Sequence, residues 1–419
     1  MSVILRDYQE ELVTKGLEVL NNLKILYLAA EVRTGKTFCS LEIANRYGAN
    51  KVLFVTKKKA ISSIQGDYDA LSPNYDIVII NKESLHKVTD DDFDFVVLDE
   101  NHTIGGSFPK PNNAAKAIKE KYSSLPMIFL SGTPAAESGS QWYHQFWMSK
   151  YSPFRQYKNF YAWAKDYTTP AIKHFGALQI KDYSKAIDVK INEKINPYLI
   201  TITQQEAGFQ TQISEKALYY ELSPLVVKMR SKLLEYLVVE GKEETILADT
   251  AAKLMSKLHQ IENGTIIFDS GNSMILDKSK AEFVKTYFSG KKLAMFYNFK
   301  KEYELIREVF GYENVTDKLD EFNNTDKHIA LQQVSGCEGI SLKAADCLVF
   351  YNWGYSGKNY IQARDRLTTI DRKENSVYFV MSKKSLTEKI YKTIIKKKRY
   401  SDKTFIKDFK LKDLFCIEN

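Results

Sequence analysis

The sequence predicts an α/β protein in which two parallel-sheet halves flank a helical middle. From residue 1 to about 135, short apolar runs alternate with helical patterns, and the same alternation resumes near residue 280. Strands that alternate with helices are typical of parallel βαβ units. Between the two halves, the apolar and aromatic residues recur at helix-like spacings instead.

The first half contains five short apolar runs, each bounded by polar or turn residues. This pattern is typical of strands that are buried on both faces, as parallel strands are. The predicted strands are Ile25–Ala30, Val52–Thr56, Ile77–Ile80, Phe95–Leu98 and Met127–Leu130.

The middle of the chain opens with a segment that is dense in aromatic residues, Gln141–Tyr167. Aromatic side chains can stack on nucleic-acid bases, but at helical spacing they more often pack against a core. We therefore predict helices with a packed aromatic face. One further strand is expected at Pro197–Thr203, and a mostly helical stretch is expected at Ser214–Gln260.

The second half repeats the features of the first. A helical pattern at Lys300–Phe310 follows its first strand, and a basic stretch ends the chain. We expect domain boundaries at 1–205, 206–275, 276–400 and 401–419, the second of these being the helical middle and the last a basic tail. The predicted strands are Lys292–Tyr297, His328–Gln332, Cys347–Tyr351 and Ser376–Met381.

Composition excludes several classes of protein. Hydrophobic residues make up 44% of the 419 residues, and the net charge of +8 permits a polyanionic partner without requiring one. The four cysteines form no C-x-x-C pair and the six histidines show no metal-ligand spacing, so neither a disulfide framework nor a zinc site is expected. The N-terminus lacks the apolar core of a signal peptide, and no apolar run is long enough to span a membrane. We expect a soluble cytoplasmic protein.

A phosphate-binding loop is predicted directly after the first strand. Residues 30–37 read AEVRTGKT and lead into a helical pattern from Phe38. Backbone N–H groups and the helix N-terminus attract phosphate oxygens in such a loop. Lys36 would place a positive charge on the β- and γ-phosphates, and the Thr37 hydroxyl would bind Mg²⁺. Ala30 replaces the first glycine of the usual motif.

A pair of acidic residues ends another predicted strand. Residues 95–102 read FVVLDENH, so that Asp99 and Glu100 follow a purely apolar run. Asp99 would hold Mg²⁺, and Glu100 would accept a proton from the attacking water. A solvated acidic turn is the alternative, and it is less favoured because the pair follows a phosphate loop.

The wording of these motifs resembles that of superfamily 2 helicases. Asp-Glu-Asn-His is similar to the Asp-Glu-x-His box of that group, and residues 5–9, LRDYQ, resemble its Q-motif. Residues 130–134, LSGTP, resemble motif III in the Snf-type, chromatin-remodeller-like form. With the following QWYHQFW at residues 141–147, the wording is most similar to compact phage and bacterial Snf-like helicases.

The second half continues the family's order of motifs. Residues 292–299 resemble motif IV, and residues 332–342, QQVSGCEGISL, resemble the Snf-type motif V. Residues 360–366, YIQARDR, resemble motif VI. Motif VI normally carries a second arginine, and this chain has Thr369 at that position. The departure places the rate of hydrolysis in question.

The resemblance implies two RecA-like lobes with a helical insertion, which bind ATP and Mg²⁺ and move on DNA. ATP would contact Arg6, Gln9, Arg33, Thr34, Gly35, Lys36, Thr37 and Asp99 from lobe 1, with Gly339 and Arg366 from lobe 2. The residues expected to act in hydrolysis are Lys36, Glu100, Gln362 and Arg366. His102, Ser131, Thr133 and Gln362 would couple the nucleotide state to closure of the lobes.

DNA contacts are expected on both lobes. The basic turn that contains Lys57 and Lys58 follows a predicted strand, where the family's motif Ia meets the phosphate backbone. By resemblance, Asn81, Ser84, Ser335 and Gly336 occupy similar places. The predicted function is an ATP-dependent helicase or translocase that acts as a monomer on duplex or branched DNA in replication, recombination or repair. An ATP-binding DNA clamp with weak hydrolysis and an RNA helicase are the alternatives.

Overall fold

The computed structural model describes residues 5–31, 33–90, 92–135, 137–175, 178–209, 212–241, 244–336, 340–356, 360, 363–369, 374–396 and 408. The internal contacts of the chain divide it into two compact units, Met1–Phe209 and Gln210–Asn419. We call these unit 1 and unit 2. Each unit has its own sheet and its own hydrophobic cores.

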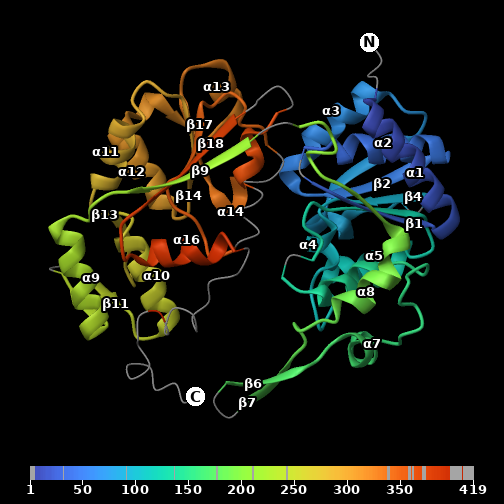
Figure 1. The fold of residues 1–419 in the computed structure, drawn as a ribbon, viewed down its shortest axis with the longest axis horizontal. Helices are drawn as coiled ribbons and strands as arrows, with labels where there is room; N and C mark the ends of the chain where they lie inside the picture. The colour runs from blue at the N-terminus through green and yellow to red at the C-terminus, as the bar shows by residue number, and fades with distance from the viewer. Residues whose placement is uncertain are drawn as a thin grey trace. The chain divides into compact units, whose positions relative to one another are not determined.

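Unit 1 is built on a six-stranded sheet in which all neighbouring strands are parallel (Figure 1). The strand order is β3-β2-β4-β5-β1-β8. All six strands predicted for this part of the chain are confirmed, with ends that differ by at most two residues. Their bounds are β1 Ile25–Ala30, β2 Lys51–Thr56, β3 Asp76–Asn81, β4 Phe95–Leu98, β5 Met127–Leu130 and β8 Leu199–Ile202.

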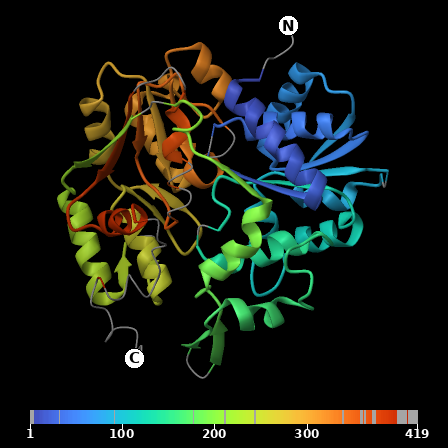
Figure 2. The ribbon, with the colours of Figure 1, turned by 45° about the vertical axis from the view of Figure 1, so that its right-hand side comes forward.

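Helices cover both faces of this sheet (Figure 2). One core lies between the sheet and the first three helices, and a second lies between the sheet and the later ones. A two-stranded hairpin, β6 Ala171–Phe175 and β7 Leu178–Asp182, extends from the same unit. The helices are α1 Asp7–Leu23, α2 Lys36–Tyr47, α3 Ile61–Leu71, α4 Asn101–Gly105, α5 Asn113–Tyr122, α6 Trp142–Trp147, α7 Phe160–Tyr167 and α8 Asp188–Ile195, with short 3-10 turns η1 Lys58–Ala60, η2 Lys82–Lys87, η3 Gly139–Gln141 and η4 Asn196–Tyr198.

The aromatic segment forms part of the core, as predicted. Tyr143, Phe154, Phe160 and Trp163 are buried and contact one another through tilted and edge-to-face ring pairs. Such pairs stabilise a core beyond the area that they bury. These four rings are therefore not available to stack on bases.

Unit 2 is built on a second six-stranded parallel sheet, of order β15-β16-β14-β17-β18-β9. Its strands are β9 Gln212–Tyr219, β14 Leu293–Tyr297, β15 Val315–Thr316, β16 His328–Gln332, β17 Cys347–Phe350 and β18 Glu374–Met381. Its helices are α9 Pro224–Tyr236, α10 Ala251–Ile261, α11 Ser279–Tyr287, α12 Lys300–Phe310, α13 Leu319–Asn324, α14 Gln333–Gly336 and α16 Leu386–Ile394, with 3-10 turns η5 Tyr312–Asn314 and η6 Asp365–Leu367.

The middle of the chain differs from the expected helical insertion. β9 pairs with β18 over its whole length, and two further hairpins, β10–β11 (Val238–Glu240 and Thr245–Leu247) and β12–β13 (Thr265–Ile267 and Ser273–Ile275), precede α11. Of this stretch, α9 and α10 are helical as predicted. Contacts place residues 210–275 in unit 2, and β9 completes the sheet of that unit.

None of the described helices is both long and apolar enough to cross a membrane.

Candidate nucleotide site

The phosphate loop lies where β1 ends and α2 begins. Gly35 has a φ of +78°, a conformation that favours glycine, and α2 starts at the next residue. Lys36 Nζ donates to the carbonyl oxygens of Ala30 and Glu31, each at 2.8 Å. The lysine is thereby held inside its own loop, at the N-terminus of a 12-residue helix. This is the arrangement that attracts a phosphate.

The predicted Q-motif packs directly on this loop. A Cβ on Gly35 would lie 2.3 Å from Gln9 Nε2, so the glutamine amide covers the glycine. Tyr8 OH donates to the carbonyl of Thr34 at 3.3 Å. Together these segments line an open cavity of about 490 Å³, which has the size of a small-molecule site. Its lining residues are Arg6, Tyr8, Gln9, Arg33, Gly35, Lys36, Thr37, Phe38 and Asp67.

The acidic pair lies at the carboxyl end of β4, outside the lining of that cavity. Asp99 Oδ2 accepts a hydrogen bond from Thr56 Oγ1 at 2.7 Å, and Asp99 Oδ1 accepts one from the backbone N–H of Glu100 at 2.9 Å. Burial, and then the Glu100 carboxylate, raise the pKa of Asp99 to about 6, although the Thr56 hydroxyl and the Lys36 ammonium act in the opposite direction. The sequence reasoning missed Thr56 as a partner of Asp99, although its hydroxyl ends the strand next to β4.

These groups fit a magnesium ion. The Asp99 carboxylate is close enough to Lys36 and Glu100 for both charges to shift its pKa, and Mg²⁺ typically binds one or two carboxylates together with phosphate oxygens. Thr37 begins the same helix as Lys36 and would add a hydroxyl ligand. Among the described residues, no group of three or more His, Cys, Asp or Glu side chains is placed to hold a metal by itself.

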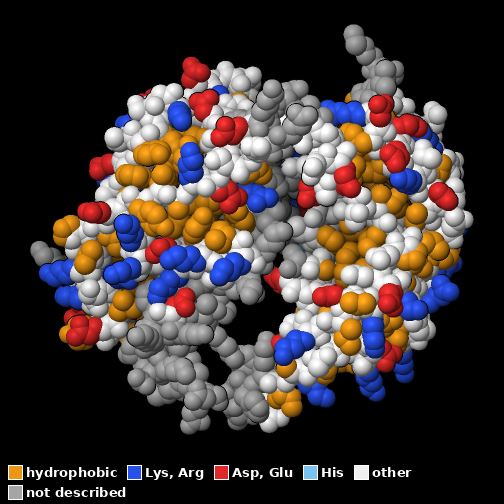
Figure 3. Space-filling model, viewed as in Figure 1, with side chains coloured by type: hydrophobic (Ala, Val, Ile, Leu, Met, Phe, Trp, Pro, Cys, Tyr) orange, Lys and Arg blue, Asp and Glu red, His pale blue; other side chains and the backbone are white. Residues whose placement is uncertain are grey.

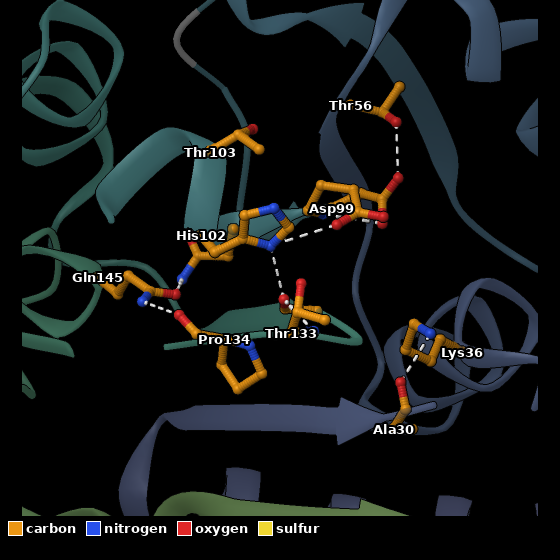
Figure 4. A network of polar contacts seen from close by, with 12 residues as sticks. Ala30, Lys36, Thr56, Asp99, His102, Thr103, Thr133, Pro134 and Gln145 are labelled. Carbon is orange, nitrogen blue, oxygen red and sulfur yellow. Dashed lines mark hydrogen bonds and ion pairs between the residues drawn. The ribbon is translucent and has the colours of Figure 1, made fainter. Parts of the chain in front are cut away.

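A chain of polar contacts runs from the acidic pair to the loop after β5 (Figure 4). His102 Nδ1 lies 2.7 Å from Ser131 Oγ and 3.3 Å from Glu100 Oε2. The same Ser131 oxygen accepts the backbone N–H of Thr133 at 3.1 Å. The contacts thus run from Glu100 through the side chains of His102 and Ser131 to the backbone of Thr133. The structure therefore brings together His102, Ser131 and Thr133.

The predicted DNA-binding residues of unit 1 lie at the carboxyl ends of β2 and β3. Lys57 and Lys58 follow β2, and Lys58 is exposed. Asn81 ends β3 and donates to Glu83 Oε2 at 3.0 Å. Ser84 lies in η2. Carboxyl ends of parallel strands share one edge of a sheet, so these residues lie along the edge that also carries the phosphate loop.

Unit 2 carries the remaining predicted site residues. Gly339 and Gln362 lie outside the described residues. Ser335 and Gly336 form the end of α14, directly after β16. Arg366 lies in η6, is only 7% exposed, and its carbonyl accepts the backbone N–H of Leu342 at 3.0 Å.

The described residues that follow Arg364 in motif VI form a 3-10 turn, Asp365–Leu367, and Thr369 is not helical. Thr368 is buried, and its hydroxyl accepts Asn375 Nδ2 at 2.8 Å. This contact ties the segment to the start of β18.

Unit 2 also contains a buried series of side-chain hydrogen bonds that the sequence analysis did not predict. His259 Nε2 lies 2.7 Å from Asn352 Oδ1, and Asn352 Nδ2 donates to Glu302 Oε1 at 2.6 Å. Asn352 Oδ1 also accepts Trp353 N–H, so it is the acceptor and His259 Nε2 the donor. Glu302 Oε2 accepts the backbone N–H groups of residues 298 and 299. These hydrogen bonds connect α10, α12 and the loop after β17.

Basic side chains gather over α9 and α16 of unit 2 in the view of Figure 3. Several of these positive charges are paired with carboxylates of the same unit. Arg230 Nε lies 2.8 Å from Glu262 Oε1, and Lys392 Nζ lies 2.9 Å from Glu388 Oε1. This region is therefore a weaker candidate for phosphate contacts than the basic turn after β2.

Comparisons with known proteins point to one group. The sequence model of the family described as SNF2-related domain matches residues 30–280. The ISWI chromatin-remodeling complex ATPase ISW1 of Saccharomyces cerevisiae is 21% identical over 375 residues, which cover 80% of this chain but 31% of that protein. The chain thus spans less than a third of that relative. The solved SWI2/SNF2 ATPase core domain of Sulfolobus solfataricus has 17% identity and a TM-score of 0.42, over 93% of this chain and 88% of its own. The family match includes the phosphate loop, the acidic pair and the Ser131–Pro134 loop.

Proposed function

We propose that this chain, which belongs to the SNF2-related family, is an ATP-driven motor that moves along duplex DNA. One observation carries the proposal. Lys36 begins the helix after β1, and Asp99 and Glu100 follow β4, which one strand separates from β1 in the sheet, so all three residues lie at the same sheet edge. Parallel sheets bind ligands at this edge.

Each residue then has a definite role in hydrolysis. Lys36 binds the β- and γ-phosphates, and the cavity around Gln9 and Tyr8 receives the rest of the nucleotide. Bound magnesium would neutralise phosphate charge, held by Thr37 and Asp99. Glu100 orients the attacking water and accepts its proton. The resemblance of residues 360–366 to motif VI assigns Arg366 the role of stabilising the charge that develops on the γ-phosphate.

The same proposal extends to the nucleic acid. Duplex or branched DNA is favoured by the Snf-type wording of the motifs, and the basic turn after β2 supplies phosphate contacts. We place the motor, as a monomer, in replication, recombination or repair in the cytoplasm, or in the host cytoplasm if a phage encodes it. An ATP-binding DNA clamp is the second candidate, and Thr369 is the observation that favours it.

Two substitutions test the assignment of the ATP site. Lys36→Ala removes a phosphate contact, so ATP binding should weaken by at least tenfold. Glu100→Gln keeps the size of the side chain but loses the proton acceptor, so binding should persist while turnover falls by about 10³-fold. Binding is measured with a fluorescent ATP analogue and turnover by phosphate release.

The two variants must behave differently for the assignment to stand. Lys15→Ala serves as a control, because Lys15 is exposed on α1 and pairs with Glu11 of the same helix, at 2.6 Å. It should match the wild type in both assays. Ordinary turnover by Glu100→Gln would overturn the role given to the acidic pair.

A further inference from the structure

Gln145 is a buried amide within a helix of otherwise large side chains. It lies in α6, among Trp142, Tyr143 and Phe146, and is fully buried. A buried amide is costly unless its hydrogen bonds are made, and a leucine or methionine would fill the same space in this core without that requirement. A glutamine at this position is therefore expected to hold specific neighbouring groups in place through the hydrogen bonds of its amide.

The amide is fully bonded. Its Nε2 donates to the carbonyl oxygens of Pro134 at 2.8 Å and of Gln141 at 3.0 Å. Its Oε1 accepts Tyr27 OH at 2.6 Å and Asn101 Nδ2 at 3.4 Å. The two carbonyls can only accept, which fixes the orientation of the amide.

Three of these partners belong to the segments predicted to carry the nucleotide chemistry, and Figure 4 shows the hydrogen bond from Gln145 to Pro134. Pro134 ends the loop after β5, and Asn101 directly follows the acidic pair. Tyr27 lies in β1, three residues before Ala30 and the phosphate loop. The backbones of α4 and α6 also lie close together at Gln145, since a Cβ on Gly105 of α4 would lie 2.6 Å from the Cα of Gln145. The backbone of α6 therefore leaves no room for a side chain at residue 105 of α4.

We propose that Gln145 is a positioning residue that fixes the Ser131–Pro134 loop relative to the turn bearing Asp99 and Glu100. The inference rests on the proposed function for its effect on rate. His102 and Ser131 form a second, buried link between the same two segments. With both links intact, the loop and the acidic turn move together. Without the amide, the loop loses its side-chain link to Asn101 through Gln145.

The test compares three variants of the full chain. Gln145→Met keeps the length and volume of the side chain and deletes all four hydrogen bonds. Tyr27→Phe removes one of them from the β1 side. Tyr143→Phe is the matched control, because its buried hydroxyl, on the same helix, has no hydrogen-bond partner among the described residues.

Hydrogen exchange gives a readout that is independent of activity. In Gln145→Met, the backbone amides of residues 131–135 and 101–105 should exchange faster together, while those of residues 36–44 in α2 stay unchanged. In turnover assays, kcat with duplex DNA should fall about tenfold and KM for ATP should stay within twofold. Tyr27→Phe should show the same pattern to a smaller extent, and Tyr143→Phe should resemble the wild type.

Two results would overturn the proposal. One is unchanged exchange of both segments in Gln145→Met. The other is faster exchange throughout unit 1 with loss of kcat and KM alike, which would mean that the amide only stabilises the core. If the wild type hydrolyses no ATP, the proposed function fails, and the exchange pattern still decides whether Gln145 holds the loop.

Discussion

At the scale of single residues, the phosphate loop depends on a glycine for two separate reasons. Gly35 has a positive φ, and the Gln9 amide lies where a Cβ would be. Gly48 at the end of α2 has a φ of +83° but no atom within 4 Å of such a Cβ. Substitutions at the two glycines therefore distinguish the effect of backbone strain, which both would suffer, from the effect of a Cβ that collides with Gln9, which only Gly35 would suffer.

We predict that Gly35→Ala and Gly48→Ala destabilise the protein similarly, by about 1 kcal/mol, since both force an L-residue into the left-handed region. Only Gly35→Ala displaces Gln9, so only this variant should weaken ATP binding, by about tenfold or more. Thermal unfolding and titration with an ATP analogue measure the two effects. Equal ATP affinities for both variants would show that Gln9 does not need its present position.

The buried His259 gives the fold a defined pH dependence. Burial lowers the pKa of His259 to about 3; the hydrogen bond with Asn352 opposes this shift and the charge of Lys280 adds to it. In the unfolded chain, this histidine has a pKa of about 6.5. Between the two pKa values, the unfolded chain therefore binds a proton at this residue and the folded chain does not. The stability from this residue is therefore complete above pH 6.5 and is lost as the pH falls towards 3.

We predict that His259→Gln reduces the difference in unfolding free energy between pH 7.5 and pH 5 by about 2 kcal/mol, which is the cost of leaving one such histidine neutral at pH 5. Denaturant titrations at the two pH values measure the difference. His86→Gln, at an exposed position of η2, is the control and should leave it unchanged. An unaltered pH dependence in His259→Gln would mean that His259 is protonated in the fold.

At the scale of elements, the strands that could be predicted are the ones buried on both faces. β4 and β5 are uninterrupted apolar runs that end in the acidic pair and in Ser131, so both the strands and the site at their ends follow from the pattern. β9 was missed because Glu215 and Lys216 interrupt it and it lies at an edge, with β18 as its one neighbour in the sheet. Edge strands tolerate charge, so their pattern resembles that of an exposed helix.

Tertiary contacts explain what the sequence could not reveal about the site. The sequence analysis gave Gln145 and Thr56 no role at the site, because their hydrogen bonds to Pro134 and Asp99 depend on the folded structure. The only signal for Gln145 is an amide at an otherwise aromatic helical position. Likewise, the hydrogen bond between Thr368 and Asn375, which joins the end of motif VI to β18, is a tertiary contact that no local pattern predicts.

The turn between β2 and α3 is the element on which the proposed DNA binding most depends. We predict that Lys57→Gln and Lys58→Gln each lower the slope of log affinity against log salt by about one unit, as expected for the loss of one phosphate contact. Fluorescence anisotropy with a short duplex between 50 and 200 mM salt, about the range in which such contacts weaken, measures the slope. Lys15→Gln on α1 should leave it unchanged. A slope that is equal in all four proteins would remove this turn from the interface.

At the scale of the whole molecule, the residues predicted to act on ATP are distributed over two units, each built on a parallel sheet of six strands. Lys36, Thr37, Asp99 and Glu100 all belong to unit 1, whereas Arg366 belongs to unit 2. The net charge of +8 favours association with a polyanion but does not select its kind. The choice between a motor and a static clamp therefore rests on whether nucleic acid changes the rate of hydrolysis.

The most direct measurement is steady-state ATP turnover of the full chain, alone and with duplex DNA, branched DNA, single-stranded DNA or RNA at equal nucleotide concentration. The proposed motor predicts that duplex or branched DNA raises kcat by about tenfold or more, that RNA raises it less, and that Glu100→Gln abolishes the increase. If the wild type binds ATP and DNA but its turnover does not change with any of the four nucleic acids, the chain is a clamp and not a motor.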